Sequence, residues 1–270
     1  MSSVAPSMVF DLDGTLCFDG VSVAAPIIRA IDRVIAAGRP VAFASARPIR
    51  DMLPLLPAAW HGHLLIGANG ALVRHGRQGA ARSFGEVDRR ELDAIIERHQ
   101  LAYLIDSPWD YSYTGPTGHR LRRQVDPGGL ARNLPRRHLK RYCKVLLFSD
   151  APQVLDCLSR LQLVAHRHTG QGLIDLSPGR TTKAEAAAQW LPGPFVAFGN
   201  DANDAQLFTA ARFSVCVGSH PVAGLADLVI AEQQVSSTIT AMHERLLAES
   251  STPCARTNTG SPRQGPWPRR

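Results

Sequence analysis

The sequence contains no run of about 18 uncharged apolar residues, which is the length that a helix needs to cross a bilayer. A membrane-spanning protein is therefore not expected. The first seven residues lack a basic segment followed by an apolar core, so no secretory signal is predicted. The five cysteines, at positions 17, 143, 157, 216 and 254, are odd in number and are not paired at metal-ligand spacing. Reduced thiols in a cytoplasmic protein are the expectation.

Lysine is also scarce, because only Lys140, Lys144 and Lys183 stand among the 30 basic residues. A lysine at a motif position is for this reason harder to explain as one of many surface charges. The rest of the composition is ordinary, since 44% of the 270 residues are hydrophobic and 20% are charged. These values fit a globular protein of one large domain or two smaller ones and exclude a largely disordered or fibrous chain.

The net charge of +7 is concentrated in two segments. Residues 119–144 carry nine Lys and Arg residues against one acid, Asp126, and residues 251–270 carry four Arg and no acid. A basic segment can bind nucleic acid or attract a small anion. The first segment contains a single aromatic residue, Tyr142, and no nucleic-acid motif is recognised. Nucleic-acid binding is therefore not the favoured interpretation.

Short apolar segments alternate with segments of helical spacing in the first 70 residues. Segments 8–10, 40–44 and 64–66 are typical of buried strands, residues 25–37 are typical of a helix, and another helix is expected after Pro48. This alternation predicts a parallel α/β sheet with right-handed connections. The pattern returns after position 172, with strands expected at 173–176, 195–198 and 213–217 and helices at 182–190, 204–211 and 235–247.

Residues 71–172 interrupt this pattern. They contain short strand-like runs, two helical segments and a loop region that is rich in Pro, Gly, Tyr and Arg. The sequence therefore predicts an α/β protein with a discontinuous core, residues 1–70 and 173–249, and an inserted α+β domain, residues 71–172. Residues 250–270 are rich in Ser, Thr, Pro, Gly and Arg, which predicts a disordered tail.

Two carboxylates follow the first predicted strand, in the segment Phe10-Asp11-Leu12-Asp13-Gly14-Thr15. In extended backbone, positions i and i+2 point the same way, so Asp11 and Asp13 can converge on one reacting centre. One carboxylate can then act as a nucleophile and the other as a general acid and base. The alternative is a solvated Asp-rich turn. Because ligands of open α/β sheets bind beyond the carboxyl ends of the strands, the position of the pair favours a site.

The apolar run followed by Asp-x-Asp-Gly-Thr resembles the first motif of the haloacid dehalogenase-like (HAD) hydrolase superfamily. Three further segments resemble the other motifs in the expected order. They are Phe43-Ala44-Ser45-Ala46-Arg47, Lys183 after Pro178-Gly179-Arg180-Thr181-Thr182, and Gly199-Asn200-Asp201-Ala202-Asn203-Asp204. Each has a structural alternative, since Ser, Asp and Asn also cap helices and Lys183 could be a surface lysine. The resemblance spans residues 8–248 and implies a Rossmann-like parallel-sheet core.

The same resemblance implies a phosphatase that works through an aspartyl-phosphate intermediate. Asp11 is then the nucleophile, and Asp13 is the general acid and base. Ser45 and Lys183 are expected to take part in catalysis, Ser45 by donating a hydrogen bond to a phosphoryl oxygen and Lys183 by neutralising charge on the nucleophile and on the phosphoryl group. The residues expected to contact that group or the substrate near it are Ser45, Ala46, Arg47, Lys183 and Asn203.

The resemblance also implies Mg²⁺ as the cofactor. The candidate ligands are Asp11, Asp13 through its main-chain carbonyl, Asn200, Asp201 and Asp204. Asn200 stands where the family has an Asp, and an Asn ligates through its carbonyl oxygen without bringing a charge. The neighbouring Asp201 can compensate in part. Which of the last three side chains contacts the metal stays open.

The inserted segment lies between the second and third motifs, which resembles the Cof-type subgroup with a large α/β cap. That subgroup includes many sugar phosphatases, so a small phosphorylated metabolite, such as a sugar phosphate, is the implied substrate. Arg122 and Arg123 in the basic segment are candidates for contacting a second anionic group of the substrate. The alternative for both is a solvated basic face.

Two other functions stay open. Similar caps occur in sugar phosphomutases, which return the phosphate to the substrate. The second alternative is a protein without catalytic activity that binds anions or nucleic acid through the basic segment. The Asn at position 200, where the family has an Asp, keeps this alternative open. A monomer or a homodimer is expected.

Overall fold

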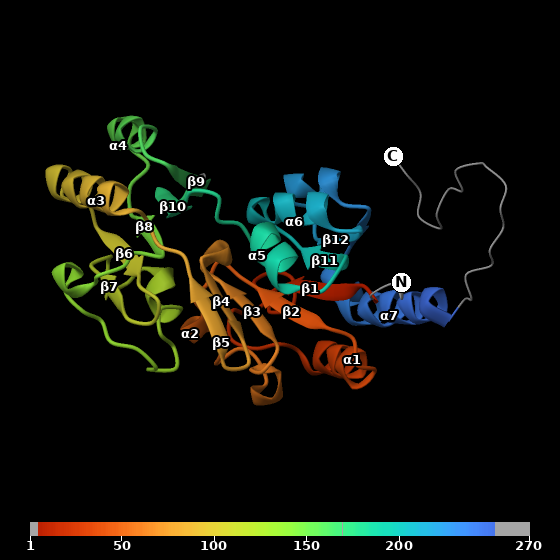
Figure 1. The fold of residues 1–270 in the computed structure, drawn as a ribbon. Helices are drawn as coiled ribbons and strands as arrows, with labels where there is room; N and C mark the ends of the chain where they lie inside the picture. The colour runs from red at the N-terminus through yellow and green to blue at the C-terminus, as the bar shows by residue number, and fades with distance from the viewer. Residues whose placement is uncertain (1–4, 169, 252–270) are drawn as a thin grey trace.

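Two β-sheets organise the chain in the computed structural model, which describes residues 5–168 and 170–251. An eight-stranded sheet and a five-stranded sheet lie next to each other along the long dimension of the molecule (Figure 1). The chain leaves the larger sheet after Ala81 and returns to it after Pro178. The predicted α/β class with a mostly parallel central sheet is confirmed.

Six strands of the larger sheet run parallel, and two antiparallel strands extend one of its edges. β1 lies inside the sheet, between β11 and β2, and all five of its residues are buried. An uninterrupted apolar run is what a parallel strand covered on both faces requires. In spatial order the strands are β13 (Leu228–Ile230), β12 (Phe213–Val217), β11 (Phe195–Gly199), β1 (Ser7–Asp11), β2 (Val41–Ala44), β3 (Leu64–Gly67), β4 (Leu72–His75) and β5 (Gln78–Ala81).

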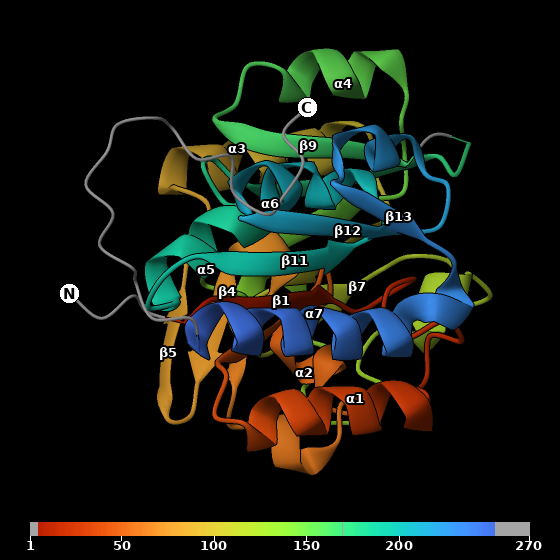
Figure 2. The ribbon, with the colours of Figure 1, turned by 90° about the vertical axis from the view of Figure 1, so that its right-hand side faces the viewer.

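Each face of the larger sheet is covered by its own pair of helices. Met8 and Phe10 pack in the cluster that includes α1 and α7, whereas Val9 packs in the cluster that includes α5 and α6. Figure 2 shows the two pairs on opposite sides of β1 and β11. The three layers bury the strands, so polar side chains collect where the strands end. The helices of this unit are α1 (Ala25–Ala36), α2 (Ile49–Met52), α5 (Lys183–Trp190), α6 (Ala205–Ala210) and α7 (Val235–Ser251).

The smaller sheet is antiparallel throughout, and two helices cover one of its faces. Ile105, Val145 and Ile174 pack against these helices. The alternate residues, such as Leu146 and Asp175, point to the opposite face, toward the larger sheet. The elements are β7 (Tyr111–Tyr113), β6 (Tyr103–Asp106), β8 (Lys144–Leu147), β10 (Leu173–Pro178), β9 (Leu163–His168), α3 (Glu86–Arg98) and α4 (Pro152–Leu158).

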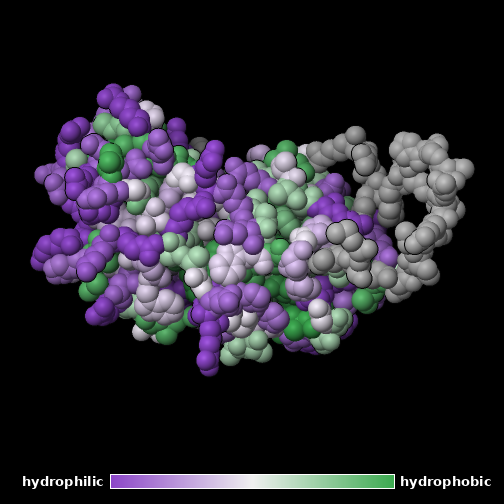
Figure 3. Space-filling model, in the orientation of Figure 1, coloured by the Kyte–Doolittle hydropathy of each residue, from purple (hydrophilic) through white to green (hydrophobic). Residues whose placement is uncertain are grey.

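Short 3₁₀ helices occupy several connections between these elements. The surface of the smaller unit is mostly hydrophilic in the view of Figure 3. Within residues 5–168 and 170–251, no helix is long and apolar enough to cross a membrane. The 3₁₀ helices are η1 (Ala58–Trp60), η2 (Ala68–Gly70), η3 (Arg120–Arg123), η4 (Arg136–His138), η5 (Ala202–Asp204), η6 (Pro221–Leu225) and η7 (Glu232–Gln234).

The predicted boundaries of the inserted segment, 71–172, need correction. β4 and β5 continue the larger sheet as an antiparallel hairpin, and β10 belongs to the smaller sheet. An apolar run predicts a strand but not the sheet that the strand joins, which explains both errors. β5 was missed because its sequence, QGAA, has no β-branched or aromatic side chain. The helix α7 continues to Ser251, and the rest of the predicted tail, residues 252–270, lies outside the described residues.

Candidate functional site

Loops at the carboxyl ends of three neighbouring parallel strands form the centre of the site. Asp11 is the last residue of β1 and is paired with Ala44 of β2, so Ser45 follows directly beside it. On the other side, the parallel register of β1 with β11 places Asn200 near the same strand end. The sheet order therefore brings the first, second and fourth motifs together.

Lys183 begins α5 and lies between two buried carboxylates. Its Nζ is 2.5 Å from Oδ1 of Asp11 and 2.8 Å from Oδ1 of Asp204, and all three residues are at least 96% buried. The Thr182 hydroxyl accepts a hydrogen bond from the Glu185 N–H at 3.1 Å and so caps the helix. This cap fixes the start of α5 and, with it, the position of Lys183.

The pKa values of this cluster reflect one cation between two acids. Burial, and then the negative charge of Asp204, raises the pKa of Asp11 to about 7, although Lys183 opposes this shift. Burial by itself would lower the pKa of Lys183, but the charges of Asp11 and Asp204 raise it above its ordinary value. With both acids ionised, the cluster carries one excess negative charge. A further cation beside Asp11 would stabilise its carboxylate form.

The two acids of the fourth motif are already engaged by the protein. Oδ2 of Asp204 accepts hydrogen bonds from the main-chain N–H groups of Asn200 and Asp201, at 2.9 and 3.2 Å, while Oδ1 faces Lys183. Asp201 is half exposed and its Oδ1 lies 3.1 Å from Nε2 of His220. Asp204 thus holds the loop and the lysine, and Asp201 points toward His220.

Asn200 contacts two oxygens of the first motif. With its amide nitrogen turned toward that loop, Asn200 donates to the main-chain carbonyl of Asp13 at 2.9 Å and to Oδ2 of Asp11 at 3.2 Å. The Thr15 hydroxyl donates to the same Asp11 oxygen at 3.1 Å. Gly14 has a φ of +78°, and a Cβ there would lie 2.1 Å from the Asn200 amide, so the approach requires glycine.

Three groups at this point could bind a metal ion. They are Oδ2 of Asp11, the main-chain carbonyl of Asp13 and the side-chain amide of Asn200. Among the described residues, no group of three or more His, Cys, Asp or Glu side chains is placed to hold a metal ion. When the amide of Asn200 is reversed, its oxygen faces the oxygens of Asp11 and Asp13. A cation bound between them would hold these three oxygens together, and oxygen ligands are those that Mg²⁺ prefers. The residues fit a Mg²⁺ site with one carboxylate.

Arg47 fixes the orientation of Asp13 beside a cavity. Its Nε and Nη2 donate to the two carboxylate oxygens of Asp13, at 2.9 and 2.6 Å. The Arg47 main-chain N–H donates to the Ser45 hydroxyl oxygen at 3.0 Å, which leaves the hydroxyl proton free to be donated elsewhere. Arg47 is buried, and its Nη1 has no partner in the described part of the chain. The structure therefore brings these three candidate residues together.

A cavity of about 320 Å³ separates Asp13 from the smaller sheet. Lys144 and Asp175 form part of its wall on the smaller sheet, and Ala46 belongs to the opposite wall. Lys144 Nζ donates to the main-chain carbonyl of Ala46 at 2.7 Å and pairs with Oδ2 of Asp175 at 2.8 Å. Neither Lys144 nor Asp175 is among the predicted site residues, although the scarcity of lysine singles out Lys144 as strongly as Lys183.

Arg122 and Arg123 do not line this cavity, so their contact with a substrate stays a prediction. Both are exposed, and the Arg122 guanidinium lies over the ring of Tyr113 at 5.6 Å. Within the basic segment, Arg120 does line the cavity and donates a hydrogen bond to Gln171.

Asn69 also belongs to the site, although it is not among the predicted residues. Ala68 and Asn69 have φ angles of 50° and 56° at buried positions after β3. The amide of Asn203 donates to Oδ1 of Asn69 at 3.5 Å, and Oδ1 of Asn203 accepts from Lys183 at 3.3 Å. Left-handed backbone at non-glycine residues is held by its surroundings and clusters at functional sites. The sequence signal was the break in the apolar pattern at Gly67-Ala68-Asn69-Gly70.

A buried ion cluster links α2 to the smaller sheet next to the cavity. Arg50 Nη2 lies 2.5 Å from Asp106 of β6, and Arg50 Nε lies 3.1 Å from Asp51. All three residues are at most 3% exposed. Two buried carboxylates thus share one guanidinium. Burial, against the attraction of Arg50, raises the pKa of Asp51 to about 7.

This raised pKa predicts a pH-dependent loss of stability. Between pH ~4 and ~7 the folded protein holds a proton on Asp51 that the unfolded chain has released, so the free energy of unfolding falls as pH rises. The loss is on the order of 4 kcal/mol by pH 8. In the Asp51→Asn variant this part of the pH dependence should vanish. Urea unfolding of both proteins from pH 4 to 8 measures it, and parallel curves for the two would contradict the assignment.

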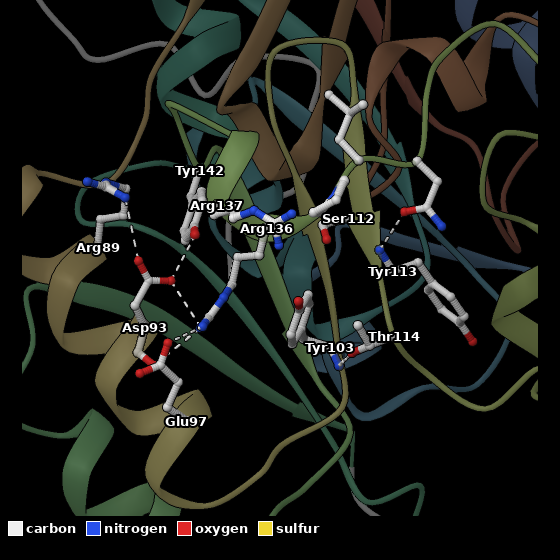
Figure 4. A pocket seen from close by; sticks show the side chains of 13 residues that line it. Arg89, Asp93, Glu97, Tyr103, Ser112, Tyr113, Thr114, Arg136, Arg137 and Tyr142 are labelled. Carbon is white, nitrogen blue, oxygen red and sulfur yellow. Dashed lines mark hydrogen bonds and ion pairs between the residues drawn. The ribbon is translucent and has the colours of Figure 1, made fainter.

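A second cavity, of about 710 Å³, lies in the smaller unit and shares no lining residue with the first. Figure 4 shows Asp93 between Arg89, Arg136 and Tyr142, with Glu97 beside Arg136. Asp93 lies 3.1 Å from Arg136 and accepts a hydrogen bond from the Tyr142 hydroxyl at 2.8 Å, and Glu97 lies 2.6 Å from Arg136. These groups satisfy one another, so the arrangement secures α3 to the sheet.

Comparisons with known proteins identify the family and the fold of the chain. The sequence profile of the haloacid dehalogenase-like hydrolases matches residues 8–237. A search of curated protein sequences finds no match. The chain also resembles several solved structures at low sequence identity.

Three of these structures show the same fold. The HAD subclass IIB sugar phosphatase BT4131 is 18% identical, with a TM-score of 0.72 over 88% of this chain and 98% of that chain. A haloacid dehalogenase-like hydrolase from Bacteroides thetaiotaomicron is 18% identical, with a TM-score of 0.75 over 88% of this chain and 100% of that chain. The phosphatase BT1666 from the same organism is 20% identical, with a TM-score of 0.70 over 91% and 97%. With its profile matched over most of its length, the chain belongs to the haloacid dehalogenase-like hydrolase family.

Proposed function

We propose that the protein is a Mg²⁺-dependent phosphatase that hydrolyses the phosphomonoester of a small metabolite, with a sugar phosphate as the favoured substrate. The observation that carries the proposal is Asp11, which is buried and held by Lys183 on one oxygen and by Thr15 on the other. Asp13, two residues later, lines the cavity in which a leaving group fits. The family membership and the sugar phosphatase among the similar structures support this reading.

The two aspartates divide the reaction into two steps. In the first step, a carboxylate oxygen of Asp11 bonds to phosphorus while the bond from phosphorus to the leaving oxygen breaks. Asp13 enters this step protonated, with one oxygen released from Arg47, and donates that proton to the leaving oxygen. In the second step, a water oxygen bonds to the phosphorus of the aspartyl-phosphate, and Asp13 takes the water proton. The bond to Asp11 then breaks, which releases phosphate and restores both side chains.

The phosphoryl group would be held by the second and third motifs. Lys183 supplies a buried positive charge, and the free hydroxyl proton of Ser45 supplies a neutral donor beside Asp11. Ala46 follows Ser45 in the same loop, and Asn203 contacts Lys183. Fixed donors around a phosphoryl group stabilise the charge that spreads over its oxygens in the transition state.

Mg²⁺ would be held by Oδ2 of Asp11, the main-chain carbonyl of Asp13 and the amide oxygen of Asn200. When bound, such an ion shields the negative charges of carboxylate and phosphate from each other. Asp204 would act indirectly, because both of its oxygens are bonded to Lys183 and to the Asn200 loop. Asp201 is the remaining candidate, and it would have to leave His220 to reach the ion.

The Asn200→Asp variant should bind Mg²⁺ more tightly than the wild type. The substitution adds a carboxylate to a site that otherwise has one, and it removes the amide donor that competes for the same oxygens. Isothermal titration of Mg²⁺ into each protein without substrate measures the change, for which about tenfold is expected. An unchanged affinity would show that Asn200 is not a ligand and would favour Asp201.

Phosphate release from a panel of phosphorylated sugars, nucleotides and cofactors tests the proposed function. We expect release with Mg²⁺, none with a chelator, and the highest rates with sugar monophosphates. Isomerisation of a sugar phosphate without phosphate release would instead indicate a phosphomutase. Salt-sensitive binding of RNA or DNA without any turnover would indicate a binding protein.

A further inference from the structure

We propose that Asp175 and Lys144 form a subsite that binds a hydroxyl group of the leaving group, so that the substrate carries one phosphate on a neutral, hydroxylated molecule. The inference rests on the proposed phosphatase function and adds the part of the substrate that the smaller unit recognises. It assigns a specificity role to two residues outside the four motifs.

The strand pattern places both side chains on the wall of the cavity that faces Asp13. In β10, Ile174 and Leu176 pack against the helices of the smaller unit, so Asp175 between them points to the other face. In β8, Val145 likewise packs against the helices, and Lys144 points to the cavity. The same face contributes Leu104, Leu146 and Leu173 to the cavity wall. Asp175 and Lys144 are therefore a polar pair among apolar side chains.

Asp175 has an oxygen that no group of the described chain satisfies. The residue is 96% buried, its Oδ2 pairs with Lys144, and its Oδ1 has no hydrogen-bond partner. A buried carboxylate oxygen without a donor costs free energy, so a donor from a ligand would be favoured. Across the same cavity, Nη1 of Arg47 is a buried donor without an acceptor. A hydroxyl group can satisfy both kinds of atom, because it donates one hydrogen bond and accepts others.

The charges around the cavity argue against a second phosphate. Three acids that line it are paired with cations: Asp13 with Arg47, Asp175 with Lys144, and Asp106 with Arg50. Of the other charged residues on the wall, the cation Arg120 is offset by the acid Asp201, and Asp51 shares the guanidinium of Arg50 with Asp106. Because no excess of positive charge is available there, a neutral leaving group fits better than a bisphosphate or a nucleotide.

The subsite is tested by comparing the wild type with the Asp175→Asn variant on two classes of substrate. The first class is a series of hexose monophosphates and their deoxy analogues, and the second is p-nitrophenyl phosphate, which has no hydroxyl group to be bound. We expect kcat/KM for the best hexose phosphate to fall by about 10- to 100-fold, mostly through KM, and the rate with p-nitrophenyl phosphate to stay unchanged. Ser177→Ala, on the same strand but not on the cavity wall, is the matched control and should change neither rate.

The deoxy analogues give a test that needs no variant. For the wild type, the kcat/KM of one deoxy analogue should be about as low as that of the parent hexose phosphate with Asp175→Asn. For this analogue, Asp175→Asn should lower kcat/KM no further. Equal effects of Asp175→Asn on hexose and aryl phosphates, or a preference for bisphosphates, would overturn the subsite while leaving the phosphatase intact. If the wild type hydrolyses neither class, the proposed function fails instead.

Discussion

Replacement of Asp11 by Asn is expected to lower the rate of phosphate release by at least about 10⁴-fold while the protein stays folded. The amide has the shape of the carboxylate but cannot attack phosphorus. The change also removes one of the two acids around Lys183 and leaves the pair of Lys183 with Asp204, at 2.8 Å, in place. The free energy of unfolding should therefore be equal to or above that of the wild type.

Asp19→Asn is the matched control for this variant. Asp19 lies in the same loop but is exposed, and among the residues that the structure describes it bonds only within its own turn, to Cys17, Val21 and Ser22. The same chemical change there should leave turnover close to the wild-type rate. Phosphate release and urea unfolding are measured on all three proteins. Turnover of Asp11→Asn near the wild-type rate would remove Asp11 as the nucleophile.

Replacement of Lys183 by Met is expected to abolish turnover and also to destabilise the fold, by about 3–5 kcal/mol. The variant leaves Asp11 and Asp204 buried without their shared cation. It also removes the positive charge that the phosphoryl group would meet. Urea unfolding at pH 8, where both acids are driven toward ionisation, measures the first effect, and phosphate release measures the second.

A double variant separates these two effects. In Lys183→Met with Asp204→Asn, one buried acid is neutral, so much of the lost stability should return. Turnover should remain absent, because the cation near the phosphoryl group is still missing. A double variant that regains activity would show that Lys183 serves folding alone.

Much of the core could be predicted because parallel strands leave a clear record in the sequence. Strands buried on both faces are short apolar runs, and the polar residues of the site follow directly where the runs end, as at Asp11 and Ser45. The order of the motifs then located Lys183 and Asn200. The structure places these four side chains around one strand end.

Other parts of the site depend on contacts that no local pattern records. The sequence does not distinguish Asp204, which is buried against Lys183, from Asp201, which is half exposed beside His220. Lys144 and Asp175 meet only because β8 and β10 are neighbours in the smaller sheet and this sheet faces the motif loops. The acid within the strand Leu173–Pro178 and the scarcity of lysine were the sequence signals of this pair.

Chemical trapping of the intermediate tests the central claim most directly. Wild-type protein is mixed with Mg²⁺ and its best sugar phosphate, quenched with acid during turnover, and treated with borohydride, which reduces an acyl-phosphate to an alcohol. Peptide mass spectrometry then locates the reduced side chain. The account predicts reduction at Asp11 only, which is lost without substrate and in the Asp11→Asn protein. Rapid turnover with no reduction at Asp11, or with reduction at Asp13 instead, would contradict it.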